Sequence, residues 1–291
     1  MYDLRFVSNN GRELRLNYEN GIIVSRVDGV TGMIVTTKTA QGYQQVGVSI
    51  SSLTVGGRDL TVNGFIFREN AQKKQEMLDV FAPFVTGRLY WEERYWIDVA
   101  VKNAPTISQN KDSTFTFRLF AADPYFRASE KITAQNGEIT GLFWFPVTYT
   151  GTTIGENRDH KFGEKEGATE FNIINRGQAS APYDLTITGS SSIVNPKLTN
   201  SMTGEFVKVN DTISVGETIR IYSDQGRIRV LKRDIGGVEH NAIASLDDES
   251  TLFSLAVGDN ILRATADTGG NDIETNISFY PLYSGVLMNG V

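Results

Sequence analysis

The chain contains no cysteine and only two histidines, His160 and His240, among its 291 residues. Without cysteine it has neither disulfides nor a thiol nucleophile. Its length allows one large or two ordinary domains, and domains of this size bury enough surface to be stable without disulfides. The absence of cysteine fits folding in a reducing cytoplasm. A catalytic triad or a zinc site would have to recruit a histidine, and both lie in polar stretches typical of exposed loops.

Long apolar runs and an excess of basic charge are missing too. Every apolar run is far shorter than the ~20 residues that cross a bilayer, and Met1–Arg5 lacks the basic and apolar regions of a secretory signal. The net charge is −6 and is spread along the chain, whereas gripping nucleic acid requires clustered Lys and Arg. We therefore expect a soluble protein with no membrane insertion and no specific nucleic-acid binding, exported only by assembly or cell lysis.

Signatures of catalysis are also missing. The sequence has no HExxH, GxSxG, P-loop or GxGxxG pattern. The densest acidic group is Asp247-Asp248-Glu249, but a glycosidase needs two carboxylates ~5–10 Å apart in a cleft, and a solvated turn is the simpler interpretation. Calcium could bind at Asp259-Asn260 or Asn271-Asp272, although no EF-hand loop is present. We assign no catalytic, cofactor-binding or metal-binding residue.

What the sequence does contain is alternation with a period of two, the pattern of half-buried strands. Phe115, Phe117 and Leu119 alternate with polar residues. Segments 218–222 and 227–230 alternate in the same way on either side of Ser223–Gly226, which predicts a β-hairpin. The chain has 28 glycines, many beside Asn or Asp, which is typical of the frequent turns between the strands of a β-sandwich. The fold class is therefore mainly β.

One segment has helical character. Asn70 can cap a helix, and Ala71 to Phe81 is rich in good helix formers. At helical spacing, Met77, Leu78, Phe81 and Phe84 share a face, and Pro83 ends the pattern. We predict one α-helix over residues 71–82 that covers the sheet of the first domain.

The domain boundary is expected between Asp123 and Asn136. Asp123-Pro124 favours an extended or turn conformation, a polar stretch follows, and Asn136-Gly137 is a turn signal. This predicts an N-terminal β-domain carrying the helix at 1–130 and a C-terminal β-sandwich at 131–291. The polar stretch Gly151–Gly167 is predicted to be a long surface loop.

Aromatic residues give two candidate contact surfaces. Tyr90, Trp91 and Trp96 flank Glu92–Arg94 as in a hairpin, and strand alternation puts Tyr90 and Trp91 on opposite faces. Phe143–Pro146 is an isolated apolar block. Such aromatics are most simply core residues, but they could also fill a subunit interface or stack on sugar rings.

The segment Gly29–Ser52 gives a third candidate. It is rich in strand-forming residues but alternates weakly, as in a long hairpin without a core of its own. A loop without regular structure is the alternative. The hairpin would find its core on a neighbouring subunit, and its candidate interface residues are Met33, Ile34, Val35, Tyr43 and Val46, together with Tyr90, Trp91 and Trp96.

A series of short motifs runs through both halves in a fixed order. The motifs are Leu60–Ile66, Phe81–Phe84, Gly87–Trp91, Asp123–Phe126, Asn175–Gly177, Ala181-Pro182, Asn195-Pro196, Gly216–Ile221 and Phe253–Asn260. Together they make the chain resemble the distal tail protein family of long-tailed phages, over nearly its whole length.

The resemblance implies a structural virion protein, not an enzyme. It implies an N-terminal domain that closes into a hexameric ring and a galectin-like or carbohydrate-module-like C-terminal sandwich. The ring would join the tail tube protein to a tail-associated lysin or fibre protein, in the virion of a phage, prophage or bacteriocin particle assembled in the bacterial cytoplasm. The alternative is a carbohydrate-binding module of a receptor-binding or cell-wall-targeting protein. A cell-wall hydrolase is a third, weaker hypothesis.

Overall fold

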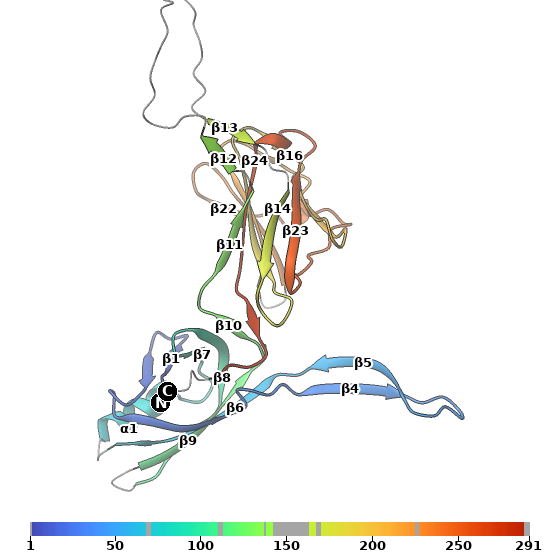
Figure 1. The fold of residues 1–291 in the computed structure, drawn as a ribbon. Coiled ribbons are helices and arrows are strands. Elements are labelled where there is room, and N and C mark those ends of the chain that lie inside the picture. Colours follow the sequence, from blue (N-terminus) through green and yellow to red (C-terminus); the bar gives the residue numbers. More distant parts are fainter. Residues whose placement is uncertain are drawn as a thin grey trace, which may run out of the picture. The chain divides into compact units, whose positions relative to one another are not determined.

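The computed structural model describes residues 2–67, 71–109, 113–136, 138–141, 163–166, 170–224 and 227–287. The chain forms two compact units, shown in Figure 1. Unit 1 comprises Met1–Glu130, Gly177–Ala179 and Tyr280–Val291, and unit 2 comprises Lys131–Arg176 and Ser180–Phe279. The chain thus returns to unit 1 at its end, and residues 280–291 lie there instead of in the second domain, where the sequence had placed them.

Unit 1 is built on an antiparallel sheet in the order β2-β1-β7-β8-β9-β6-β3, with β10 and β25 paired at its side. Its strands are β1 (Leu4–Ser8), β2 (Glu13–Leu16), β3 (Ile22–Asp28), β6 (Arg58–Ile66), β7 (Thr86–Trp91), β8 (Tyr95–Ile107), β9 (Ser113–Ala121), β10 (Phe126–Ala128) and β25 (Leu282–Tyr283). Two further strands, β4 (Val35–Ala40) and β5 (Ser49–Val55), pair only with each other. In β9 every second residue is buried, as the alternation of Phe115, Phe117 and Leu119 predicts.

The predicted helix is present as α1 (Ala71–Val80) and covers one face of this sheet. Met77 and Phe81 are fully buried, and the Phe81 ring stacks on Phe6 and Phe117 at centroid distances of 4.7 and 4.3 Å. The prediction that Leu78 and Phe84 share this buried face is wrong, because Leu78 is 41% and Phe84 97% exposed. The helix ends before Pro83, and Phe84 takes a positive φ of 67° that turns its side chain away. The proposed cap, Asn70, lies outside the described residues.

Unit 2 contains two larger antiparallel sheets, in the orders β11-β24-β15-β20-β21-β22 and β14-β23-β17-β18. The pairs β12–β13 and β16–β19 form small separate ladders. The strands are β11 (Ile132–Gln135), β12 (Glu138–Gly141), β13 (Gly163–Glu166), β14 (Glu170–Asn175), β15 (Tyr183–Gly189), β16 (Ile193–Val194), β17 (Lys197–Asn200), β18 (Phe206–Lys208), β19 (Thr212–Ile213), β20 (Thr218–Asp224), β21 (Arg227–Arg233), β22 (Glu239–Asn241), β23 (Gly258–Thr265) and β24 (Ile273–Phe279). Two short 3₁₀ turns are η1 (Ile243–Ser245) and η2 (Gly270–Asp272).

Each larger sheet of unit 2 buries alternate residues, which gives the two apolar faces of a sandwich. The mainly β fold with a single α-helix in the described part of the chain is thereby confirmed. The predicted hairpin is also confirmed, because β20 pairs with β21 from Thr218↔Arg233 to Asp224↔Arg227. Within the predicted loop Gly151–Gly167, residues 163–166 form β13 instead. The rest of that loop and the block Phe143–Pro146 lie outside the described residues.

Candidate functional site

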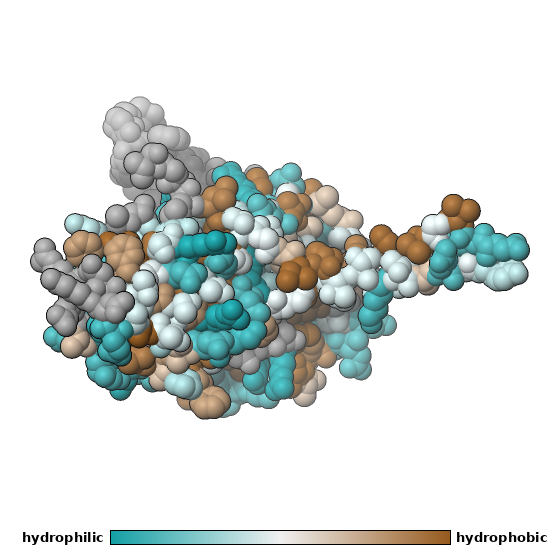
Figure 2. All heavy atoms as spheres, turned by 90° about the horizontal axis from the view of Figure 1, so that it is seen from below, coloured by the Kyte–Doolittle hydropathy of each residue, from teal (hydrophilic) through white to brown (hydrophobic). Residues whose placement is uncertain are grey.

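The β4–β5 hairpin is the most exposed ordered element of unit 1, and we call residues 31–57 the arm. It extends away from the sheet in Figure 1, and Figure 2 shows apolar side chains along it, including at its tip. Every residue of β4 is exposed, and so is every residue of β5 except the half-exposed Ser52. The segment is therefore a hairpin, as predicted, but it runs to Val55 and not only to Ser52.

One face of the arm is apolar. The register pairs Val35 with Val55, Thr37 with Leu53 and Thr39 with Ile50. Paired residues lie on the same face of a ladder, so Val35, Leu53 and Val55 would share a face even in a regular register. A bulge between Lys38 and Thr39 shifts the register by one residue and brings Ile50 to the same face.

The bulge itself is stabilised. Its extra residue, Ser51, donates a hydrogen bond from Oγ to the Lys38 carbonyl at 3.0 Å. The opposite face carries Thr36, Lys38, Ser52 and Thr54 and is polar. The arm is consequently one-sided, unlike the two-sided hairpin expected from its weak alternation.

The tip of the arm is an ordered loop built around Gln45. The Gln45 side chain accepts a hydrogen bond from the Gly42 amide at 2.9 Å and donates one to Ser49 Oγ at 3.0 Å. This loop leaves Tyr43 95% exposed and Val46 fully exposed. A solvated loop has no need to present two apolar side chains from a hydrogen-bonded frame, so the tip has the character of a contact surface.

Charge is nearly absent from the arm. Residues 31–57 contain one charged side chain, Lys38, although charged residues make up 21% of the chain. Exposed hairpin edges usually carry charges that prevent pairing with other chains, and the cores of protein interfaces are depleted of charge. The composition of the arm is therefore that of an interface and not that of a solvated surface.

The candidate interface residues divide into two groups. In the arm, Ile34, Val35, Tyr43 and Val46 are exposed, and Met33 is half-buried. In the β7–β8 hairpin, by contrast, Trp91 is 3% exposed in the hydrophobic core, and Trp96 is 7% exposed on the opposite face, beneath Arg88 and Arg127. Both are buried within the subunit, so their assignment to an interface is corrected. Residues 90 and 91 do face opposite sides of the strand, as predicted.

Arginines cover the aromatic rings that reach the outer face of this hairpin. The Arg5 guanidinium lies 4.0 Å from the Tyr90 ring centroid. The Trp96 ring contacts Arg88 at 3.8 Å and Arg127 at 4.8 Å. These cation–π contacts occupy the ring faces, so the half-buried Tyr90 is a weaker interface candidate than the arm.

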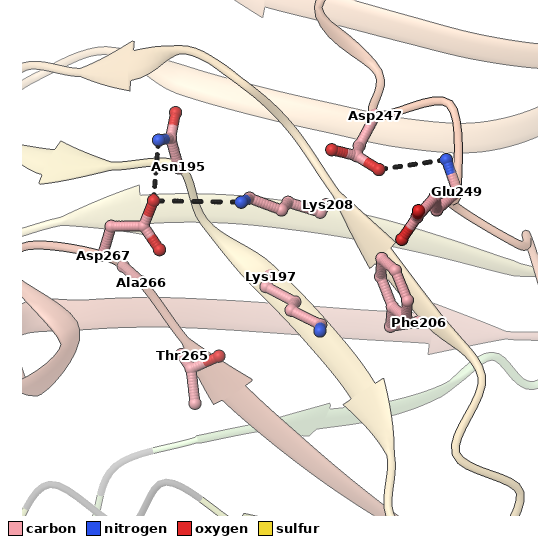
Figure 3. A pocket seen from close by; sticks show the side chains of 9 residues that line it. All are labelled: Asn195, Lys197, Phe206, Lys208, Asp247, Glu249, Thr265, Ala266 and Asp267. Carbon is pink, nitrogen blue, oxygen red and sulfur yellow. Dashed lines mark hydrogen bonds and ion pairs between the residues drawn. The ribbon is translucent and has the colours of Figure 1, made fainter.

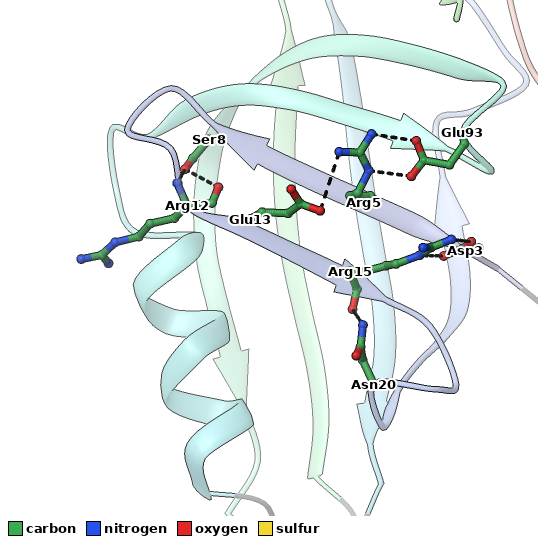
Figure 4. Close-up of polar contacts among 8 residues, drawn as sticks. All are labelled: Asp3, Arg5, Ser8, Arg12, Glu13, Arg15, Asn20 and Glu93. Carbon is green, nitrogen blue, oxygen red and sulfur yellow. Dashed lines mark hydrogen bonds and ion pairs between the residues drawn. The ribbon is translucent and has the colours of Figure 1, made fainter.

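Figure 4 shows how the charges around β1 and β2 are arranged. Arg5 pairs with Glu93 through Nε and Nη2, at 2.5 and 2.7 Å, and reaches Glu13 at 3.7 Å. Arg15 makes a two-pronged pair with Asp3, which lowers the pKa of the Asp3 carboxyl. Arg5 and Arg15 are thus neutralised by carboxylates, and Arg12 donates to the Asp79 carbonyl. Arg5 and Arg15 therefore offer little net positive potential to a phosphate.

A cavity in unit 2 has a volume of about 250 Å³ and is shown in Figure 3. Several of the polar groups that line it are already paired. Asp267 accepts from Asn195 Nδ2 at 2.8 Å and lies 3.8 Å from Lys208 Nζ. The one aromatic residue that lines it, Phe206, has the Lys197 ammonium 3.8 Å from its ring centroid. A sugar ring would have to displace this lysine before stacking on Phe206.

Comparison with known proteins identifies the second half of the chain. A family described as "Siphovirus-type tail component, C-terminal domain" matches residues 176–283. Residues 176–283, which include most of unit 2, are thus similar to a siphovirus-type tail component domain. The resemblance stated from the sequence is confirmed by this match. No curated protein matches the chain.

Two solved structures with a similar fold align with nearly the whole chain. The crystal structure of the SPP1 Dit protein, described as a paradigm of the hub adsorption apparatus in phages infecting Gram-positive bacteria, aligns with a TM-score of 0.66 at 12% identity. The alignment covers 96% of this chain and 98% of that one. A chain of the phage P2 baseplate, in its activated conformation with calcium, aligns with a TM-score of 0.52 at 10% identity over 98% of this chain and all of the other.

Three polar residues of unit 2 that the sequence marked as candidates have hydrogen-bond partners in the structure: Asp247, Asn260 and His240. Asp247 accepts hydrogen bonds from Asn210 Nδ2 and the Glu249 amide, which lower the pKa of its carboxyl and fix the turn predicted there. Asn260 is buried, and its amide donates to the Ala256 and Gly258 carbonyls. His240 is exposed as predicted but lies on β22, not in a loop, 3.2 Å from Asp234. His160 lies outside the described residues.

No group of three acidic or histidine side chains that could hold a metal ion occurs among the described residues. In the same part of the chain, no helix is long and apolar enough to span a bilayer. The sequence singled out the arm by its strand-forming residues and weak alternation, but it held no sign of the bulge that collects the apolar residues on one face.

Proposed function

We propose that this chain is the hub protein of a phage tail tip, in which six copies form a closed ring through unit 1. The observation that carries the proposal is the arm: an ordered, one-sided, nearly uncharged hairpin whose apolar face has no cover in its own subunit. A closed ring requires a head-to-tail interface, with two different patches on each subunit. The arm supplies one of these patches.

The ring would connect the tail tube protein to a tail-associated lysin or fibre protein, as part of a virion assembled in the host cytoplasm. The match of unit 2 to a tail-component family and the fold shared with the SPP1 Dit protein support this assignment. In this role the chain is a structural protein and not an enzyme. Six copies carry a formal charge of 6 × −6, or −36, which repels a passing DNA duplex and limits its adhesion.

The test compares two neighbouring substitutions on opposite faces of the arm. Leu53→Asp places a charge on the apolar face, and Ser52→Asp places the same charge on the polar face. Light scattering should show a hexamer of the 32.2 kDa chain for the native protein and for Ser52→Asp, and smaller species for Leu53→Asp. Equal masses for the two variants would remove the arm from the ring interface, and a monomeric native protein would overturn the ring.

A deletion gives an independent check. Removing residues 33–55 and joining the ends with Gly-Ser deletes both strands of the arm, whereas a deletion of 33–46 would leave β5 without its partner. The deleted chain should melt cooperatively, because the described arm residues contribute nothing to the hydrophobic core of unit 1. Loss of the hexamer with folding intact is the expected outcome.

The carbohydrate-binding alternative makes a different prediction. A sugar-binding module acts as a monomer, and its ligand would be revealed on a glycan array. The cavity around Phe206 is the place to test, with Lys197→Ala to uncover the ring. Binding by the native chain that is lost in Phe206→Ala would favour the alternative over the hub.

A further inference from the structure

The base of the arm is held by a buried arginine. Arg58, the first residue of β6, is 5% exposed. Its Nη1 donates to the Gly29 and Val30 carbonyls at 2.8 and 2.7 Å, and its Nη2 donates to the Ser284 carbonyl. Gly29 and Val30 precede the arm directly, whereas Ser284 lies 226 positions beyond Arg58 in the chain.

Removing the Arg58 guanidinium from water costs free energy, which its contacts must offset. Burial removes water from the guanidinium and lowers the pKa of Arg58. Its buried Nε has no hydrogen-bond partner, and the group lies 5.1 Å from the Phe126 ring centroid. Breaking the hydrogen bonds of a buried charge is strongly destabilising, so the bonds of Arg58 stabilise the arrangement of the chain in which they form. Here the arrangement joins the start of the arm to the segment after β25.

Residues 29–34 join β3 to β4, and we call them the neck of the arm; they belong to no strand. The pairing of β3 with β6 ends at Asp28↔Thr61, and the pairing of β4 with β5 begins at Val35↔Val55. Between these ladders the direction of the arm depends on how residues 29–31 are fixed. Gly285 packs against this neck so tightly that a Cβ there would lie 3.0 Å from the Thr31 Cα and the Val30 carbonyl oxygen.

The segment after β25 is itself fixed within unit 1. Tyr283 pairs with Phe126 of β10. Ser284 donates from its amide and hydroxyl to Gln178 Oε1, at 2.9 and 2.7 Å. Val286 is buried in the hydrophobic core. The segment therefore forms a firm support to which Arg58 ties the neck.

We infer that Arg58 and residues 284–286 form a lock that sets the direction of the arm and makes it competent for assembly. Residues 284–286 follow unit 2 in the chain. An arm made early in synthesis is therefore fixed only after the whole of unit 2 has been made and the chain has returned to unit 1. The lock makes ring formation conditional on a chain that extends through residue 286. This inference rests on the proposed role of the arm in the ring.

The expected size of the effect follows from population arithmetic. If loss of the lock leaves about a tenth of the arms in the competent direction, the apparent association constant falls about tenfold. The midpoint concentration of ring assembly should rise by the same factor.

The direction of the arm can be measured apart from assembly. The chain has no native cysteine, so Thr36→Cys in β4 and Thr116→Cys in β9 can carry a specific pair of spin labels. The distance distribution between the labels, recorded with excess unlabelled chain, should be narrow in the otherwise native protein. It should broaden in Arg58→Met and in a chain that ends after Tyr283. Arg88→Met, which removes an arginine from β7, is the matched control and should leave the distribution narrow.

Folding is checked first by cooperative melting. Gly285→Val, which pushes against the neck but keeps Arg58, decides the question if Arg58→Met does not fold. An unchanged distance distribution in a folded lock variant overturns the lock, and so does equal broadening in Arg88→Met. Broadening without a rise in the assembly midpoint overturns its link to assembly. A native protein that stays monomeric would overturn the ring proposal, but the label distances would still show whether the lock exists.

Discussion

Gly29 is the residue at which the chain leaves β3 for the arm. Its φ is +88°, and a Cβ there would lie 2.0 Å from the Asp59 carbonyl oxygen. Gly11, in the turn between β1 and β2, has a similar φ of +81°, but a Cβ there would have no atom within 4 Å. Comparing substitutions at these two glycines therefore separates the cost of a positive φ from the cost of a steric clash.

We predict that Gly29→Ala lowers the free energy of unfolding by about 3 kcal/mol or more, since strain and a backbone clash combine. Gly11→Ala should cost only about 1 kcal/mol, the strain of the left-handed conformation for a residue with a Cβ. Urea unfolding of the two variants measures the difference. Similar losses of unfolding free energy in both variants would show that the backbone around Asp59 moves to relieve the clash at little cost.

The Asp3–Arg15 pair gives stability a dependence on pH. Hydrogen bonds from Arg15 lower the pKa of Asp3 below its ordinary value of 3.8. A carboxyl whose pKa is lower in the folded state stabilises the fold above pH 3.8, and this contribution is lost as the pH falls further. Asp3→Asn should therefore melt at a lower temperature than the native chain at pH 7.

The melting temperatures of the two proteins should converge below pH 3.8. The pair is partly exposed, so 1 M salt should also reduce the difference at pH 7. A difference that stays constant from pH 7 to pH 2 would contradict the assignment of this carboxylate.

Among the elements, α1 shows how one helix distributes its apolar residues. Met77 is fully buried against the sheet, whereas Leu78 next to it is 41% exposed. Met77→Ala should reduce the free energy of unfolding by about 2–4 kcal/mol, because it removes buried atoms and leaves a cavity. Leu78→Ala should cost less than about 1 kcal/mol. Equal losses, measured by denaturant unfolding, would mean that the helix packs on the sheet through its other face.

At the scale of the whole molecule, the chain crosses between its units more than once. Unit 2 runs from Lys131 to Phe279 apart from the short segment Gly177–Ala179, and unit 1 includes β25 and the residues after it. We therefore propose residues 131–279, and not 131–291, as the fragment that folds independently.

The fragment 131–279 should melt in one cooperative transition with a β-rich circular dichroism spectrum. The fragment 1–130 should be less stable than unit 1 in the full chain, because it lacks β25, Val286 and the carbonyl of Ser284. Adding the peptide 280–287 in excess should partly restore its stability. A fragment 1–130 as stable as unit 1 in the full chain would show that the returning segment is dispensable.

The sequence by itself determined the strands, the single helix and the likeness to a phage tail protein. These follow from local periodicity, which records how each residue alternates between a covered and an open side. Periodicity predicted the burial of Phe115 and Phe117, and the weak alternation of strand-forming residues marked the arm as unusual.

Only the tertiary structure decided which apolar residues are covered. Alternation separates the two faces of a strand but does not say what packs on either, and both Trp91 and Trp96 proved to be buried although they face opposite sides. Helical spacing likewise placed Phe84 on the buried face of the helix, but the chain turns after α1 and leaves it exposed. The bulge that gathers Ile50 with Leu53 depends on pairing between strands, which local periodicity does not record. The link from Arg58 to Ser284 joins residues 226 positions apart, and only the folded backbone brings a carbonyl from one end of the chain to a guanidinium near the other.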